Sequence, residues 1–169
     1  MAGDKFLYNN AGTITEKVSN QASAGAGDAG KIVALDSTGR IDNTMMPVGI
    51  GADTAVITAS EALAAGDLVN VWNSTGAKVR KADASVAGKE AHGFVLAAVS
   101  SSASATVYFE GTDTQVTGQT PGVVYLSAAT PGLATTTAPS GTGQVVQRVG
   151  FATSATAINF QSLPPVVLA

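Results

Sequence analysis

His92 is the only histidine in the chain and the first residue whose type offers chemistry. Glu90 lies two positions earlier and on a strand would point the same way, so a carboxylate–imidazole pair is conceivable. A general base also needs a nucleophile and a positioned partner, and the sequence has no cysteine and no second histidine. We interpret His92 as an ordinary rim residue and predict no catalytic site. The alternative is an envelope-degrading hydrolase that uses His92.

Four aspartates recur along the N-terminal third, and oxygen-rich loops of this kind can hold Ca²⁺. They are Asp28, Asp36, Asp42 and Asp53. Their spacing lacks the D-x-[DN]-x-[DN]-G pattern of a calcium loop. Asp36 stands before a Ser-Thr-Gly sequence and is better explained as a turn former. We therefore predict no metal site.

Residues 25–30, GAGDAG, match the glycine pattern G-x-G-x-x-G of dinucleotide-binding loops. That fingerprint requires a strand before it and a helix after it. Here a polar, small-residue segment precedes it and a predicted strand follows it. The match indicates a flexible linker, and we predict no cofactor.

Composition narrows the possible partners. Charged residues make up 12% of the chain, against about 25% in typical soluble domains. The net charge is −3 and no basic run is present, so we expect no nucleic-acid partner. The longest apolar run, residues 94–99, is far shorter than the ~20 residues of a membrane span, and the N-terminus lacks a signal-peptide pattern. We expect synthesis in the cytoplasm and no membrane partner.

Short strands separated by Gly, Ser and Pro turns dominate the chain, whereas the only short helical candidate, 60–65, is expected to be a turn. The predicted strands are 54–59, 68–72, 77–81, 93–99, 106–110, 123–127, 133–138, 144–153 and 156–161. Gly76 supplies the positive φ of the turn between the second and third of these strands. This spacing predicts an all-β fold, a small β-barrel or β-sandwich of short antiparallel strands. We expect Trp72, Phe94, Phe109, Phe151 and Phe160 in its core.

The first 53 residues differ from the rest in composition, and we predict that they form an extended N-terminal arm or anchoring segment. A β domain follows at 54–169. Residues 20–30 have the composition of a flexible linker, and 31–35 is expected to be a strand. The arm is too polar to bury its own apolar residues. We predict that these residues contact a partner or a neighbouring subunit: Phe6, Leu7, Tyr8, Ile32, Leu35, Ile41, Met45 and Met46.

A degenerate duplication is visible within the β domain, between residues 66–109 and 122–160. Each copy opens with an apolar strand and later has a Gly-Phe pair, Gly93-Phe94 or Gly150-Phe151. Each copy closes on a strand that ends in Phe109 or Phe160. Chance alignment of small-residue β sequences is the alternative explanation.

Several stretches resemble a known family. The run GDAGKIVALDSTGRID at 27–42, followed by MPVG at 46–49, is similar to segments near the N-termini of tailed-bacteriophage head decoration, cement and head-fibre proteins. So are LAAGDLV at 63–69, YLSAATPG at 125–132 and VVQRVG at 145–150. Related motifs recur in tail-fibre modules. The resemblance carries no catalytic residues.

The resemblance implies a structural virion protein, usually a homotrimer, on the outer capsid surface. Its partners would be the major capsid protein of the phage head and other copies of itself. Deleting residues 1–45 should then leave a folded β domain that no longer binds capsids. The alternative is a head-fibre or tail-fibre-associated module that binds a host surface glycan.

Overall fold

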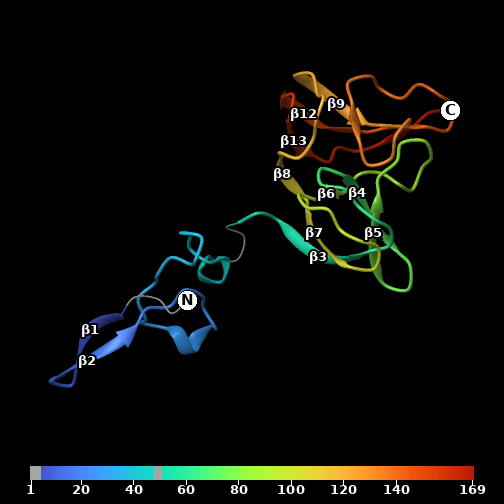
Figure 1. Ribbon diagram of the computed structural model, residues 1–169. Helices are drawn as coiled ribbons and strands as arrows, with labels where there is room; N and C mark the ends of the chain where they lie inside the picture. The colour runs from blue at the N-terminus through green and yellow to red at the C-terminus, as the bar shows by residue number, and fades with distance from the viewer. Residues whose placement is uncertain (1–4, 48–50) are drawn as a thin grey trace. The chain divides into compact units, whose positions relative to one another are not determined.

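The computed structural model describes residues 5–47 and 51–169, and the expectations that fall on residues 1–4 and 48–50 lie outside these ranges. The chain divides into two compact units, 1–51 and 52–169. Both are built from strands and turns, so the fold is all-β, as predicted (Figure 1).

The N-terminal unit contains a β-hairpin that the sequence reading did not predict. Its strands are β1 (Lys5–Asn10) and β2 (Thr13–Val18), and they pair antiparallel from Lys5↔Val18 to Asn10↔Thr13. Two 3₁₀ turns follow, η1 (Ala26–Asp28) and η2 (Asn43–Met45). The strand expected at 31–35 is reduced to one parallel bridge between Asn20 and Val33. The strand does not form because, among the described residues, only Asn20 forms the bridge, through hydrogen bonds to the Ile32 carbonyl and from the Ala34 N–H.

The C-terminal unit begins with a closed barrel in the order β3-β5-β4-β6-β7. The strands are β3 (Thr54–Ala59), β4 (Leu68–Asn73), β5 (Ala77–Lys81), β6 (Gly93–Phe94) and β7 (Ser104–Tyr108). All pairs are antiparallel except β3 with β5, which pair in parallel and close the barrel. The β4–β5 turn contains Gly76 at φ 109°, which confirms the predicted hairpin.

A five-stranded sheet follows in the order β10-β9-β12-β13-β8. The strands are β8 (Glu110–Asp113), β9 (Gly122–Leu126), β10 (Ala134–Thr135), β12 (Arg148–Ser154) and β13 (Ala157–Gln161). A separate pair joins β11 (Val145–Val146) to β14 (Val166–Val167). The predicted strand at 144–153 is therefore divided between two sheets.

The barrel and the sheet share one strand pattern. If the five strands of each half are numbered in chain order, both halves have the lateral order 3-2-4-5-1, and every pair within that order is antiparallel. Equivalent residues also share a register, because Phe94 faces Tyr108 in the barrel and Phe151 faces Asn159 in the sheet. The halves differ in closure, since only the barrel pairs its first strand with its third.

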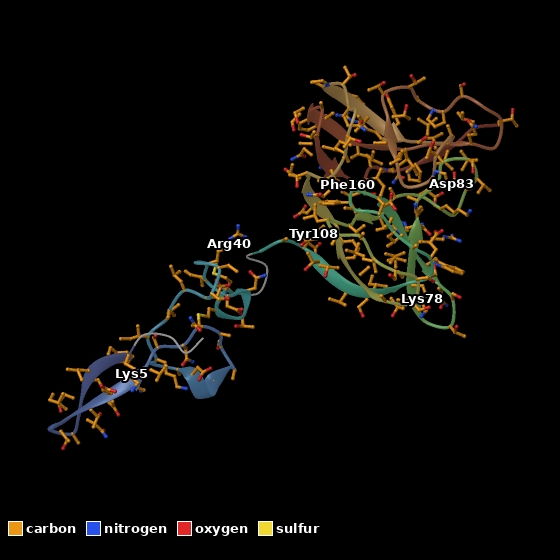
Figure 2. All side chains as sticks on the ribbon, in the orientation of Figure 1. Lys5, Arg40, Lys78, Asp83, Tyr108 and Phe160 are labelled. Carbon is orange, nitrogen blue, oxygen red and sulfur yellow. The ribbon has the colours of Figure 1, made fainter. Side chains whose placement is uncertain are left out.

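Two apolar clusters stabilise the C-terminal unit. One fills the barrel around Val69, Val79 and Val107. The larger cluster lies between barrel and sheet. Here the Phe94 ring stacks on Tyr108 with ring centroids 5.4 Å apart, and it is tilted against Phe160 with ring centroids 5.5 Å apart. Phe160 is labelled at this junction in Figure 2. Burial of these rings stabilises the fold by roughly 25 cal/mol for each Å² of apolar area that it removes from water.

The expected core aromatics separate into three groups. Phe94 and Phe160 are 1% exposed, which confirms their prediction. Phe109 and Trp72 are half-buried, and the Trp72 ring lies under the Arg80 guanidinium at 4.6 Å. The prediction for Phe151 is wrong: this residue is 44% exposed, because its position on β12 alternates with the buried Gly150 and Ala152.

Candidate functional site

The described part of the N-terminal unit has no apolar core. Among residues 5–47 only Ser19 is buried. Eight of its large apolar side chains are instead exposed: Leu7, Ile14, Val18, Ile32, Val33, Leu35, Ile41 and Met46. We treat these eight residues as the candidate functional site and call them the apolar surface of the N-terminal unit.

The hairpin presents apolar residues on both faces, because alternate residues of a strand point to opposite sides. Leu7 and Ile14 lie on one face, and Leu7 is 70% exposed. Phe6 and Tyr8 lie on the other, with ring centroids 6.4 Å apart and the Lys17 ammonium 5.0 Å from the Tyr8 ring. A lone two-stranded hairpin is at best marginally stable in water, so an additional surface would stabilise it.

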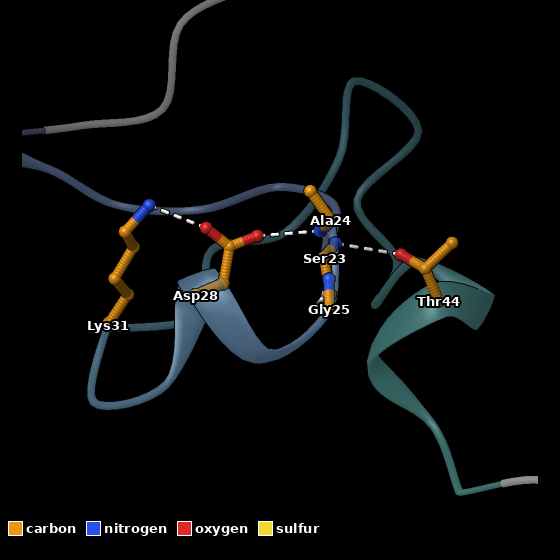
Figure 3. A network of polar contacts seen from close by, with 6 residues as sticks. All are labelled: Ser23, Ala24, Gly25, Asp28, Lys31 and Thr44. Carbon is orange, nitrogen blue, oxygen red and sulfur yellow. Dashed lines mark hydrogen bonds and ion pairs between the residues drawn. The ribbon is translucent and has the colours of Figure 1, made fainter.

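Polar contacts hold the rest of the unit together. Figure 3 shows the Asp28 carboxylate accepting from the Lys31 ammonium at 2.5 Å and from the Ala24 backbone N–H at 2.6 Å. In the same network the Ser23 backbone N–H donates to Thr44 Oγ1 at 2.8 Å. The hydrogen bond from Lys31, with the backbone donor and Asn20, lowers the pKa of Asp28 to about 2.

Asp36 and Asp42 shape two turns that place apolar residues. Asp36 Oδ1 accepts from the Thr38 and Arg40 backbone N–H groups, which confirms its predicted role as a turn former. Asp42 caps η2 by accepting from the Thr44 N–H. These hydrogen bonds, led by those from the two threonine hydroxyls, lower the pKa of both carboxyls.

The eight residues named from the sequence as contacts are distributed over this unit. Leu7, Ile32, Leu35, Ile41 and Met46 are exposed, and Phe6, Tyr8 and Met45 are half-buried. The sequence reading missed Ile14, Val18 and Val33. The alternation in TITEKV, residues 13–18, is the signal that would have found the first two.

The four aspartates considered as metal ligands are divided between the two units. Asp28, Asp36 and Asp42 bond to local groups, and Asp53 lies in the other unit. Over residues 5–47 and 51–169 the structure contains no cluster of three or more potential metal-ligating His, Cys, Asp or Glu side chains. The GAGDAG segment forms the exposed turn η1 and is followed by the bridge at Val33.

His92 and Glu90 are each engaged with nearby backbone. His92 is exposed, and its Nδ1 accepts from the Val71 N–H at 3.1 Å. Glu90 Oε1 accepts from the Gly88 N–H at 2.9 Å. The structure does not show the carboxylate–imidazole hydrogen bond that a catalytic pair would use.

One buried carboxylate stands apart from these groups. Asp113 is fully buried at the end of β8, where Oδ1 accepts from the Gln115 N–H and Oδ2 has no hydrogen-bond partner. Burial, with a smaller effect of the charge on Asp67, raises the pKa of Asp113. Neutralisation of the carboxyl relieves the cost of burying its charge.

None of the helices in the described residues is long and apolar enough to cross a membrane. No protein-family model, curated protein or solved structure matches the chain.

Proposed function

We propose that this protein is a structural virion protein, a homotrimeric decoration or cement protein on the outer capsid surface of a tailed-phage head. One observation carries the proposal: the N-terminal unit exposes its large apolar side chains and has no apolar core among its described residues. In this proposal the unit is the anchor, and its apolar surface is buried against the major capsid protein or a neighbouring copy.

The polar network explains how such an anchor can exist before it binds. Hydrogen bonds at Asp28, Asp36 and Asp42 fix local turns without using apolar contacts. The apolar residues between these turns are therefore available for a partner. Transfer of their exposed area from water into a contact is favourable at roughly 25 cal/mol per Å².

Repetition makes modest contacts sufficient. A trimer presents three anchors to a symmetric shell, and linked contacts can exceed the affinity of one contact by 10²–10⁴. The resemblance of residues 27–42 and 46–49 to phage decoration proteins supports the same role, because these residues belong to this anchor. Low charge also suits broad contact surfaces, since few ions must be desolvated.

Co-sedimentation with empty, expanded phage heads tests the proposal. Leu7→Thr combined with Ile14→Thr keeps β-forming residues but removes two exposed apolar side chains, and we expect capsid affinity to fall about tenfold or more. Val56→Thr is the matched control, because Val56 is 71% exposed on β3 in the other unit. Equal binding by all three proteins would contradict the anchor assignment.

Deletion of residues 1–45 provides a second test. The C-terminal unit keeps both of its apolar clusters, so we expect it to fold and to lose capsid binding. Undiminished binding by the folded fragment would place the contact elsewhere.

A glycan-binding head-fibre module is the second candidate, favoured by an open pocket of about 370 Å³ in the C-terminal unit. Hydroxyl and amide side chains line it: Ser127, Thr135, Thr137, Ser140 and Gln144. Such groups hydrogen-bond sugars, although no aromatic platform lines the pocket. Binding of the purified protein to a glycan array, lost in Thr137→Val and without capsid binding, would favour this function.

A further inference from the structure

The five-stranded sheet has a solvent-facing side that carries exposed apolar residues. We call this side the outer face and define it by Thr112, Val123, Tyr125, Phe151 and Asn159. Val123 and Phe151 are register partners on β9 and β12 and are 39% and 44% exposed. Asn159 and Thr112 continue the same cross-strand row on β13 and β8. The apolar pair therefore lies in a row without charged residues.

The equivalent pair in the barrel is covered. Leu68 and Phe94 are register partners on β4 and β6, at the positions that Val123 and Phe151 occupy in the sheet. Both are 1% exposed, because the inner side of the five-stranded sheet packs over them. The same strand pattern thus occurs twice, and its apolar pair is buried by a β-sheet in one half and open in the other.

Charges near the outer face favour another copy of this chain as the cover. Arg148 is paired with Tyr125 on β9, and Glu110 is paired with Gln161 on β13. Both charged residues are exposed, and neither forms an ion pair with the described residues. A surface with one charge of each sign beside an apolar pair is complementary to a copy of itself.

The positions of the two charges also indicate the symmetry. Arg148 pairs with Tyr125, two residues along β9 from Val123, because a register shift between Arg148 and Gly150 takes up one residue of β12. Glu110 lies two residues along β8 from Thr112, toward the same end of the sheet, and strand β13 lies between β12 and β8. Rotation about an axis parallel to the strands preserves height along the strands. Such a rotation can therefore bring Arg148 of one copy to Glu110 of the next, and three sheets facing one axis satisfy this arrangement.

We propose that the outer face is the surface through which copies of this chain associate, with Phe151 toward a symmetry axis parallel to the strands. The inference rests on the proposed function only for the number of copies, which is three. The partner is a second copy of the chain, and the contact combines the Val123–Phe151 pair with an Arg148–Glu110 ion pair between copies.

Light scattering of the full-length protein over a concentration series tests the inference. We expect the wild type to have three chain masses. Phe151→Thr should raise the dissociation midpoint about tenfold or more, because a central aromatic residue contributes strongly to an interface. Val56→Thr, which likewise replaces an exposed apolar residue by threonine but on β3, should leave the midpoint unchanged.

A charge exchange tests the identity of the partner. Arg148→Glu and Glu110→Arg should each weaken association by placing like charges together, and the double variant should recover most of the loss. Circular dichroism of each variant shows whether the β fold is retained. A double variant that is no better than the single ones, in folded protein, would overturn the contact.

Parallel capsid co-sedimentation separates this inference from the proposed function. A monomeric wild type that still binds heads overturns the outer-face contact and leaves the decoration role intact. Loss of head binding in Phe151→Thr with unchanged mass also overturns it, because the shell would then be the partner. The expected masses and variant effects without head binding would overturn the decoration role alone.

Discussion

Gln147 is the residue whose replacement tests how the two halves of the C-terminal unit are joined. Its side chain is 1% exposed and connects the loop before β6 to the segment after β13. Oε1 accepts from the Ala91 N–H at 2.7 Å, and Nε2 donates to the Ala91 carbonyl at 2.9 Å. Nε2 also lies 3.2 Å from Ser162 Oγ and 3.3 Å from the Leu163 carbonyl oxygen.

The cost of Gln147→Ala follows from the groups that it leaves behind. The Ala91 N–H loses its partner in a fully buried position, at about 1–3 kcal/mol. The Ala91 carbonyl keeps a bond from Ser162 Oγ at 2.9 Å, so its loss is smaller, about 1 kcal/mol. We expect the free energy of unfolding to fall by about 2–4 kcal/mol, a large share of the 5–15 kcal/mol of a typical domain.

Gln147→Glu separates the hydrogen bonds from side-chain volume. The glutamate keeps an acceptor for the Ala91 N–H but, when ionised, places a second carboxylate oxygen against the Ala91 carbonyl. Burial would raise its pKa above the unfolded value, so the folded state would bind more protons. The loss of stability relative to the wild type should therefore be greatest at neutral pH and decrease as pH falls through that raised pKa.

Urea unfolding followed by circular dichroism and by the fluorescence of Trp72, the only tryptophan, measures these effects. Gln161→Ala is the control, because Gln161 is exposed on β13 and should change stability by no more than about 0.5 kcal/mol. A loss below about 1 kcal/mol for Gln147→Ala would refute the role assigned to this side chain. So would a Gln147→Glu deficit that is the same at every pH.

Three further changes have expected outcomes. Gly150→Ala should lower the free energy of unfolding, measured by urea titration, by about 2 kcal/mol or more. Gly150 has φ +128°, and a Cβ at this position would collide with a backbone carbonyl. Gly27→Ala is the control, because Gly27 has open space around it. Asp113→Asn should stabilise the protein at neutral pH. The pKa of this buried carboxyl is raised in the folded state, so the wild-type protein loses stability as pH rises through that pKa. Thermal unfolding of the variant should lack that pH dependence. Asp28, with a pKa of about 2, should stabilise its network above about pH 4 and lose that effect as pH falls toward 2. NMR chemical shifts of residues 20–34 would follow this transition. An Asp28→Asn protein with the same transition would contradict the assignment.

Local pattern was sufficient for the strands that carry their own turn signals. The segments 54–59 and 77–81 were predicted with their observed bounds, and Gly76 marked the turn because it tolerates positive φ. The all-β class follows from such features, since each depends on residues within a few positions. The contact candidates could also be proposed from sequence, because an apolar residue in a polar arm is visible without coordinates.

Features that depend on long-range pairing were missed. The hairpin β1–β2 turns through Ala11 and Gly12, where positive φ at Ala11 gives no sequence signal. The expected strand at 93–99 shortens to Gly93–Phe94 because its partner β4 begins at Leu68, the residue opposite Phe94. Beyond it the chain keeps only single backbone contacts, such as the bridge between Leu63 and Val99. β8 is too polar and glycine-rich to be recognised as a strand, and its pairing with β13 defines it.

The sequence by itself determined that the chain is all-β, where most strands begin, and which apolar residues lie in a segment too polar to bury them. Only the tertiary structure decided which of two equivalent Gly-Phe pairs is buried. Phe94 is buried and Phe151 is exposed, although each follows a glycine in the same Gly-Phe dipeptide. The difference arises because burial depends on whether another sheet packs over that face. That packing joins residues far apart in the chain, so no local pattern contains it.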